Sequence, residues 1–337
     1  MLKRRKNFEA AAGPVILCII CFLSGKVQLP FKLDIDKVIK ETFSVAAVNT
    51  KYQRPTLLEE LDKALINEPE KPTKEVNSQP MVAIAEKINV TEKTVTYDKD
   101  QPDFTGYDNV FLTNHTDFNI DINSLMNNYN PPSKKEDVQI LVIHTHATEG
   151  YADSIGSRTT ETDKNMIKIG DVFTKTLKEK GFNVVHDVKL HDYPSYNGSY
   201  ANSLKVMNWY MDYYPQIDII FDLHRDAVGT TDDSRVKFVT EIDSKKAAQM
   251  MFVIGTNEGG LNHPSWQENL KFATGLQNVV CNMYPNLMRA VDLRKERFNQ
   301  HVTKNSIIVE VGSNGNTIEE AEYAVTLLAE ALSKYIT

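Results

Sequence analysis

The stretch VQILVI, Val138–Ile143, is a short apolar run rich in β-branched residues. Runs of this kind are typical of a strand that is buried on both faces of a sheet. The stretch IDIIFDL, Ile217–Leu223, has the same character, and so does Ser306–Val311 near the C-terminus. We therefore predict a domain that opens at Asp137 with a buried strand. Further strands are predicted at Phe182–Val185, Val236–Ile242 and Met250–Ile254.

Segments with helical periodicity alternate with these strands. Apolar residues recur at helical spacing in Asn165–Lys180, in Tyr200–Met211 and in Pro264–Met283. A last helix begins with a capping box, in which Thr317 and Glu320 satisfy each other's backbone donors. This alternation predicts an α/β domain with a mostly parallel sheet and helices on both faces. In such sheets ligands bind at the carboxyl ends of the strands.

The N-terminus has the pattern of a membrane-targeting segment. Met1–Lys6 is basic, and Ala10–Gly25 contains no charge. No Ala-x-Ala cleavage site follows, so we favour an uncleaved transmembrane anchor over a cleaved signal peptide or a buried helix. The basic tip would stay in the cytoplasm. We therefore expect a single-pass protein of the cell membrane whose remaining residues lie outside the cytoplasm.

Residues 1–30 are thus assigned to the tip and anchor, 31–136 to a stalk, and 137–337 to the catalytic domain. The stalk is polar throughout, and Glu68–Pro80 is rich in Pro, Lys and Glu, as linkers are. Two short pieces, Pro80–Ile88 and Asn109–Leu112, are candidates for accessory strands.

Charge and cysteine content exclude two classes of protein. The net charge of −7 argues against nucleic acid as a partner, because phosphate binding depends on an excess of Lys and Arg. Of the three cysteines, Cys18 and Cys21 lie in the apolar N-terminal stretch. The single remaining cysteine, Cys281, cannot form a disulfide framework.

Polar residues gather where the predicted buried strands end. His144, His146 and Glu149 follow the first strand, His224 follows Ile217–Leu223, and Glu310 lies within the last strand. Zinc hydrolases hold the metal with three nitrogen or oxygen ligands, and a further carboxylate can act as base. His144 and His146 are two residues apart, and we expect only one of them to bind metal directly.

Each of these residues also has a simpler explanation. The two histidines after the first strand could be surface residues of a loop, and His224 could be a structural histidine. A buried Glu310 needs a metal or a cation, and a salt bridge to Arg225 would serve equally well.

Four segments resemble the stage II sporulation protein P family, and they occur in the same order along the chain. They are ILVIHTHATEGY (Ile140–Tyr151), DIIFDLHRDA (Asp218–Ala227), Phe298–Gln300 and IIVEVGSNGNTIEEA (Ile307–Ala321). The resemblance implies a zinc amidase-like domain that hydrolyses peptidoglycan during forespore engulfment. Cleavage is expected at the amide bond between N-acetylmuramic acid and the stem peptide, and at peptide cross-links. Stage II sporulation proteins D and M are the implied partners.

The resemblance also assigns roles to residues. Zinc is expected on His144 or His146, on Glu149 and on His224, with Glu161 as the alternative carboxylate. Glu310 is expected to accept a proton from water and pass it to the departing amine. Arg225 is expected to stabilise a substrate carboxylate or the developing oxyanion.

Two other functions compete with this one. A histidine pair after a strand also occurs in metal-dependent amidohydrolases with a β/α barrel, but that barrel needs about 250 residues and eight repeats. Too few strands follow Asp137 for such a barrel. A catalytically inactive wall-binding scaffold is the other alternative, and metal occupancy distinguishes it from an enzyme.

Overall fold

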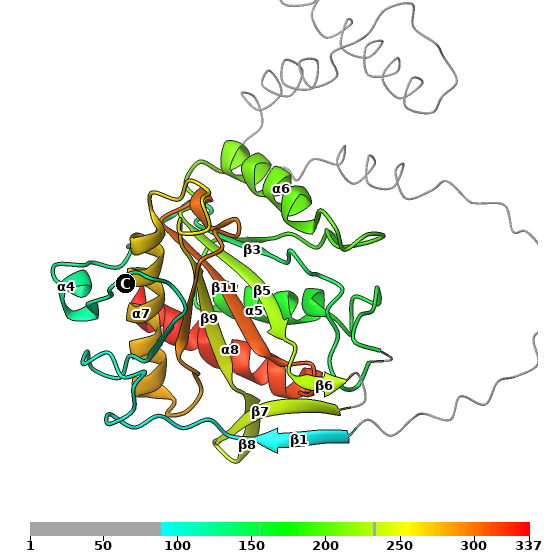
Figure 1. Ribbon diagram of the computed structural model, residues 1–337. Helices are drawn as coiled ribbons and strands as arrows, with labels where there is room; N and C mark the ends of the chain where they lie inside the picture. The colour runs from blue at the N-terminus through cyan, green and yellow to red at the C-terminus, as the bar shows by residue number, and fades with distance from the viewer. Residues whose placement is uncertain (1–88, 155, 232–233) are drawn as a thin grey trace, which may run out of the picture. The chain divides into compact units, whose positions relative to one another are not determined.

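The computed structural model describes residues 89–154, 156–231 and 234–337, and the predicted anchor and most of the predicted stalk lie outside them. Figure 1 shows the elements of this part. In chain order they are β1 (Asn89–Lys93), β2 (Leu112–Asn114), α4 (Ile122–Met126), β3 (Ile140–Ile143), α5 (Met166–Glu179), β4 (Val184–His186), α6 (Ser199–Tyr213), β5 (Ile219–Asp226), β6 (Gly229–Thr231), β7 (Ser234–Ile242), β8 (Lys245–Ala248), β9 (Met250–Gly255), α7 (Trp266–Met283), β10 (Val291–Arg294), the 3₁₀ turn η1 (Gln300–Val302), β11 (Asn305–Ser313) and α8 (Ile318–Tyr335).

The main sheet has seven strands in the order β2-β10-β9-β11-β5-β3-β4. Within the described residues its pairings are parallel except that of β11 with β9. The prediction of an α/β domain is therefore confirmed. A smaller sheet joins β1, β6 and β8 to β7.

Helices cover both faces of the main sheet because its central strands are apolar on both sides. In β3, Ile140 and Val142 belong to the large core that includes residues of α5, α7 and α8. Leu141 and Ile143 point to the opposite face, where they pack with Met207 of α6. In Figure 1, α6 accordingly lies apart from α5, α7 and α8.

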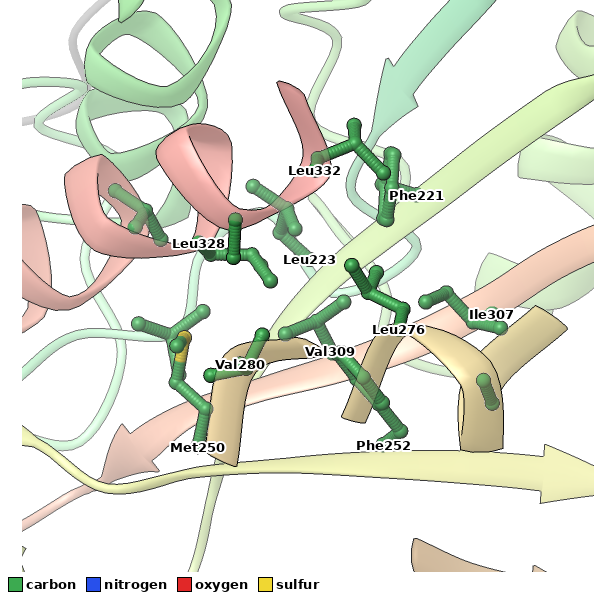
Figure 2. Close-up of a cluster of buried hydrophobic side chains, with 14 of the residues drawn as sticks. Phe221, Leu223, Met250, Phe252, Leu276, Val280, Ile307, Val309, Leu328 and Leu332 are labelled. Atoms are coloured by element: carbon green, nitrogen blue, oxygen red, sulfur yellow. The ribbon is translucent and has the colours of Figure 1, made fainter. Parts of the chain in front are cut away.

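The large core lies between β5 and β11 on one side and α7 and α8 on the other. Figure 2 shows Leu328 of α8 and Val280 of α7 near Leu223 and Val309 of the sheet. All four side chains are fully buried. Burial of a leucine side chain of this kind stabilises the fold by about 1.5–3 kcal/mol, so this layer fixes β5 and β11 side by side.

Part of the segment predicted as stalk belongs to this architecture. Strand β2 is the edge strand next to β10, and Leu112 and Ile122 are members of the large core. Strand β1 pairs in parallel with β7 in the smaller sheet. In the range 89–136 the chain is therefore packed against the domain, which the predicted boundary at 137 did not include.

Among the described residues, no helix has both the length and the apolar character required to cross a membrane.

Candidate metal centre

The polar residues identified in the sequence lie where β3, β5 and β11 run parallel. Glu310 of β11 pairs with His224 of β5, so the two side chains come from neighbouring strands at the same level. Beyond Glu310 the register shifts in a bulge at Gly312, whose φ is 67°. A Cβ atom there would lie 2.7 Å from Oδ1 of Asn316, so only glycine fits the bulge.

Strand alternation selects the face on which these groups lie. Phe221 and Leu223 of β5 point into the large core. Asp222 and His224 alternate with them and therefore point to the opposite face, the one covered by α6. The site is thus built on the α6 side of the sheet.

His146, Glu149 and His224 form a group that can hold a metal ion, with one ligand atom of each lying within 4.8 Å of the others. Nδ1 of His146 lies 3.6 Å from Oε1 of Glu149, and Nδ1 of His224 lies 3.7 Å from Oε2. All three side chains are buried. Two imidazoles and one carboxylate are a common ligand set for catalytic zinc.

The other nitrogen of each imidazole has a partner of its own. Nε2 of His146 is hydrogen bonded to Oγ of Ser199 at 3.0 Å. Nε2 of His224 forms an ion pair with Oδ1 of Asp222 at 3.0 Å. Thr145 fixes the Asp222 carboxylate by donating from its backbone nitrogen and its hydroxyl. Both rings are thus held with Nδ1 toward the group.

The charges of the group also favour a cation. Burial lowers the pKa of His224, but the carboxylates of Asp222, Glu149 and Glu310 outweigh it and raise the pKa to about 10. Burial raises the pKa of Glu149, yet His146, His224 and Arg225 lower it to about 2. Without a metal, a protonated imidazole balances the carboxylates, and a divalent cation would replace that proton.

Glu310 lies next to this group and has different surroundings. Part of its side chain reaches solvent, but Oε2 is buried and has no hydrogen-bond partner among the described residues. Burial and the charges of Glu149 and Asp226 raise the pKa of Glu310 to about 8, although His224 and Arg289 act in the opposite direction. A carboxyl group with such a pKa can accept and release a proton near neutral pH.

His144 is not part of the group. It continues the alternation of β3 and lies beneath α5, with Nε2 2.8 Å from Nε2 of His186 and Nδ1 hydrogen bonded to the carbonyl of Leu223. A Cβ atom on Gly170 of α5 would lie 2.4 Å from Nε2 of His144. Between the two histidines left open by the sequence, the geometry therefore selects His146.

Arg225 contacts the loop that contains Glu149. Its Nε and Nη2 donate to the carbonyls of Gly150 and Ser157, and its backbone nitrogen donates to Oε2 of Glu149 at 3.1 Å. The side chain is buried. Arg225 therefore supports the loop that holds Glu149, and its role as an oxyanion stabiliser stays a prediction.

Glu161, the alternative carboxylate, lies away from the group. Its side chain is 59% exposed and forms an ion pair with Lys164. Asp226 at the end of β5 accepts from Nη2 of Arg289 at 2.9 Å. Neither residue contacts His146 or His224.

Several residues around the group carry no signal in the sequence. Ser199 is the first residue of α6, and Arg158, Asp192 and Tyr196 lie in loops. They reach the site through contacts between segments that are far apart in the chain, which neither periodicity nor a motif reveals.

The fold and the site together describe an α/β protein that has a candidate His–Glu–His metal centre with a carboxyl group beside it. The family model of stage II sporulation protein P matches residues 34–333. The chain belongs to this family.

One curated relative is the stage II sporulation protein P of Bacillus subtilis (strain 168), which is 26% identical over 216 residues. The match covers 58% of this chain and 50% of the relative, so the chain spans about half the length of that protein.

Solved amidase structures show weaker likeness. The CwlD amidase from Clostridioides difficile, in complex with the GerS lipoprotein, is 12% identical with a TM-score of 0.37, and the match covers 58% of this chain and 98% of that one. The N-acetylmuramoyl-L-alanine amidase AmiC2 of Nostoc punctiforme is 13% identical with a TM-score of 0.33, covering 60% and 97%. TM-scores below 0.5 do not establish a shared arrangement of the site.

Proposed function

We propose that this chain is a zinc-dependent peptidoglycan hydrolase of sporulation. It cleaves the amide bond between N-acetylmuramic acid and the stem peptide, and peptide cross-links, during engulfment of the forespore. The proposal includes an N-terminal membrane anchor, an extracytoplasmic catalytic domain, and stage II sporulation proteins D and M as partners. Family membership supports the cellular process, and the geometry of the site supports the chemistry.

The observation that supports hydrolysis most is the combination of two features. His146, Glu149 and His224 converge on one point, and Glu310 on the adjacent strand has a buried, unpartnered oxygen. The donor set of two imidazoles and a carboxylate fits zinc. A protein group holds the second ring nitrogen of each imidazole, as is usual for metal-binding histidines.

Zinc bound there would act as a Lewis acid that polarises the scissile carbonyl and makes a water molecule more acidic. Glu310 accepts the proton of the attacking water at its unpartnered Oε2 and later delivers it to the leaving nitrogen. Asp222 and Ser199 keep the rings of His224 and His146 in place during these steps. His146, Glu149 and His224 are buried, and the low local dielectric strengthens their electrostatic interactions.

The test is cleavage of purified peptidoglycan by the zinc-loaded full-length chain in detergent, with the products identified by mass spectrometry. Wild type should release stem peptides with a new amino terminus at alanine. Glu310→Gln should keep zinc but lose activity by a factor on the order of 10²–10⁴, as expected for loss of a general base. Glu179→Gln, a change at the exposed end of α5, is the matched control and should behave as wild type.

Two results would contradict the proposal. One is a zinc-loaded wild type that leaves peptidoglycan intact with the partner proteins present, which would favour a wall-binding scaffold. The other is a Glu310→Gln variant as active as wild type.

A further inference from the structure

Arg158 lies directly beside the metal group. Its backbone forms an antiparallel bridge with Glu149, and the nitrogen of Thr159 donates to the carbonyl of Thr148 at 2.8 Å. These contacts join the loop that contains Arg158 to the loop that contains Glu149. The guanidinium is thus placed at the rim of the candidate centre, with Nη2 4.0 Å from Oε1 of Glu149.

One side of the guanidinium is fixed by the protein. Nη1 donates to Oδ2 of Asp192 at 2.6 Å and to the hydroxyl of Thr148 at 3.1 Å. The Asp192 side chain has no exposed surface, so this ion pair is anchored in the interior. The guanidinium carbon also lies 4.4 Å from the ring centre of Tyr196, which in turn stacks on His146 at 4.5 Å. These contacts hold Arg158 in one orientation.

The other side of the guanidinium is open. Within the described residues, the hydrogen bonds donated by Arg158 come from Nη1, and the 4.0 Å separation from Glu149 is too long for a hydrogen bond. The side chain is 37% exposed, whereas that of Arg289 is 10% exposed and that of Arg225 is buried. The Nε and Nη2 donors therefore form a fork on a partly exposed side chain beside Glu149, and a fork of this kind binds carboxylates in bidentate fashion.

The charges around the site decide whether the Arg158 fork favours an anionic substrate over a neutral one. Glu149 and Asp222 place negative charge beside the two imidazoles, whereas Asp226 is already paired with Arg289, so a bound anion needs a cationic partner of its own. Arg158 is the most exposed of the three arginines near the centre, so it can supply that partner to a bound carboxylate. A neutral substrate would gain less from it.

We propose that Arg158 is a specificity-determining residue that binds a free carboxylate of the stem peptide next to the scissile amide. The chemical class is an acidic peptide, in which the γ-linked glutamate of the stem has a carboxylate rather than a carboxamide. Because it names the substrate of the same site, this inference rests on the proposed function. Its recognition step can be measured without cleavage.

The probes are two synthetic stem peptides that differ only in that group, one with a carboxylate and one with a carboxamide. Their binding to the zinc-loaded full-length chain is measured by calorimetry, and cleavage of the matching muropeptides is measured in parallel. Wild type should bind the carboxylate form more tightly by on the order of tenfold or more, as expected for a charged hydrogen-bonded pair. The preference should vanish in Arg158→Ala.

Two further variants separate recognition from folding. Arg158→Lys keeps the charge beside Asp192 but loses the fork, so it should fold and show a reduced preference. Arg294→Ala is the matched control, because Arg294 ends β10, which lies between β2 and β9 and does not border β3 or β5. Its preference should equal that of wild type.

The inference is overturned if wild type binds both peptides equally. It is also overturned if Arg158→Lys keeps the full preference or if both Arg158 variants weaken both peptides by the same factor. Failure of the proposed function gives a different pattern, in which binding still discriminates but neither muropeptide is cleaved. Cleavage without discrimination would leave the function intact and remove the role of Arg158.

Discussion

At the scale of single residues, the candidate centre depends on how each imidazole is oriented. His146 and His224 both direct Nδ1 toward Glu149, since Ser199 and Asp222 hold the other nitrogen. Asp222 is itself fixed by two hydrogen bonds from Thr145. Thr145 lies between the two histidines of the HTH motif, and its contacts with Asp222 support His224 through that carboxylate.

This arrangement predicts the effect of Asp222→Asn. The amide cannot stabilise the N–H of His224 as a carboxylate does, so zinc affinity should fall by about 10–100-fold. Competition with a chelating indicator measures this affinity. Asp226→Asn is the control, because Asp226 contacts Arg289 and no imidazole of the group, and it should change the affinity little. Equal zinc affinity in Asp222→Asn and wild type would contradict the role of Asp222.

The sequence identified the chemically important residues better than their partners. His224 and Glu310 stand out because they follow or interrupt apolar strands. The choice between His144 and His146 could not be made, because it depends on where β3 ends and how the chain turns after Ile143. The structure places that turn so that His146 and His144 lie on opposite faces of the sheet.

At the scale of elements, α8 shows how a local motif fixes a helix boundary. The predicted capping box is present, with Thr317 accepting from the nitrogen of Glu320 and Glu320 accepting from the nitrogen of Thr317. Glu320 also accepts from Lys237 and Asn316. The start of α8 is thus tied to the segment that follows Glu310.

Thr317→Ala should therefore lower the free energy of unfolding by about 0.5–2 kcal/mol. Urea denaturation followed by circular dichroism measures this loss. Thr326→Ala is the matched control inside the same helix, where alanine has the higher helix propensity and little or no loss is expected. A loss in Thr326→Ala as large as that in Thr317→Ala would show that the cap has no special role.

Some elements gave no sequence signal. Strand β8 has the sequence KKAA, which lacks the alternation of a half-buried strand, and it forms because it pairs with β7 across a turn at Asp243 and Ser244. Both turn residues have positive φ values. Strand β2 was anticipated in part, because the candidate strand Asn109–Leu112 overlaps it at Leu112; it is three residues long and is stabilised by its position beside β10.

At the scale of the whole molecule, the sheet is mostly parallel, as predicted, but β9 runs antiparallel to β11. The described residues between β5 and β9 form β6, β7 and β8 and contain no helix, so the helical crossover that makes neighbours parallel is missing from them. Helix α7 then connects β9 to its parallel neighbour β10. The direction of a strand depends on these connections and on the order of the strands in the sheet. Hydrophobic periodicity in the sequence predicts neither of them.

The stability of the whole domain should depend on pH through His263. Burial and the charges of His301 and Arg297 lower the pKa of His263 to about 4, below its usual value of 6.5. Between these values the unfolded chain binds more protons than the folded chain, so stability should fall as the pH drops from 6.5 toward 4. Thermal unfolding across this range measures the effect.

His263→Gln removes this ionisable group and should make the melting temperature less dependent on pH over the same interval. His115→Gln is the control, because His115 is half exposed beside Asp292. A pH dependence that is unchanged in His263→Gln would contradict the assignment.

The central claim is that His146, Glu149 and His224 hold zinc and that His144 does not. Zinc stoichiometry of the full-length chain in His146→Asn and His144→Asn tests it most directly, since the two changes are identical and lie two residues apart in one motif. We predict that wild type and His144→Asn retain about one zinc ion, as for a single catalytic site, and that His146→Asn loses it. Loss of zinc in His144→Asn with retention in His146→Asn would contradict the account.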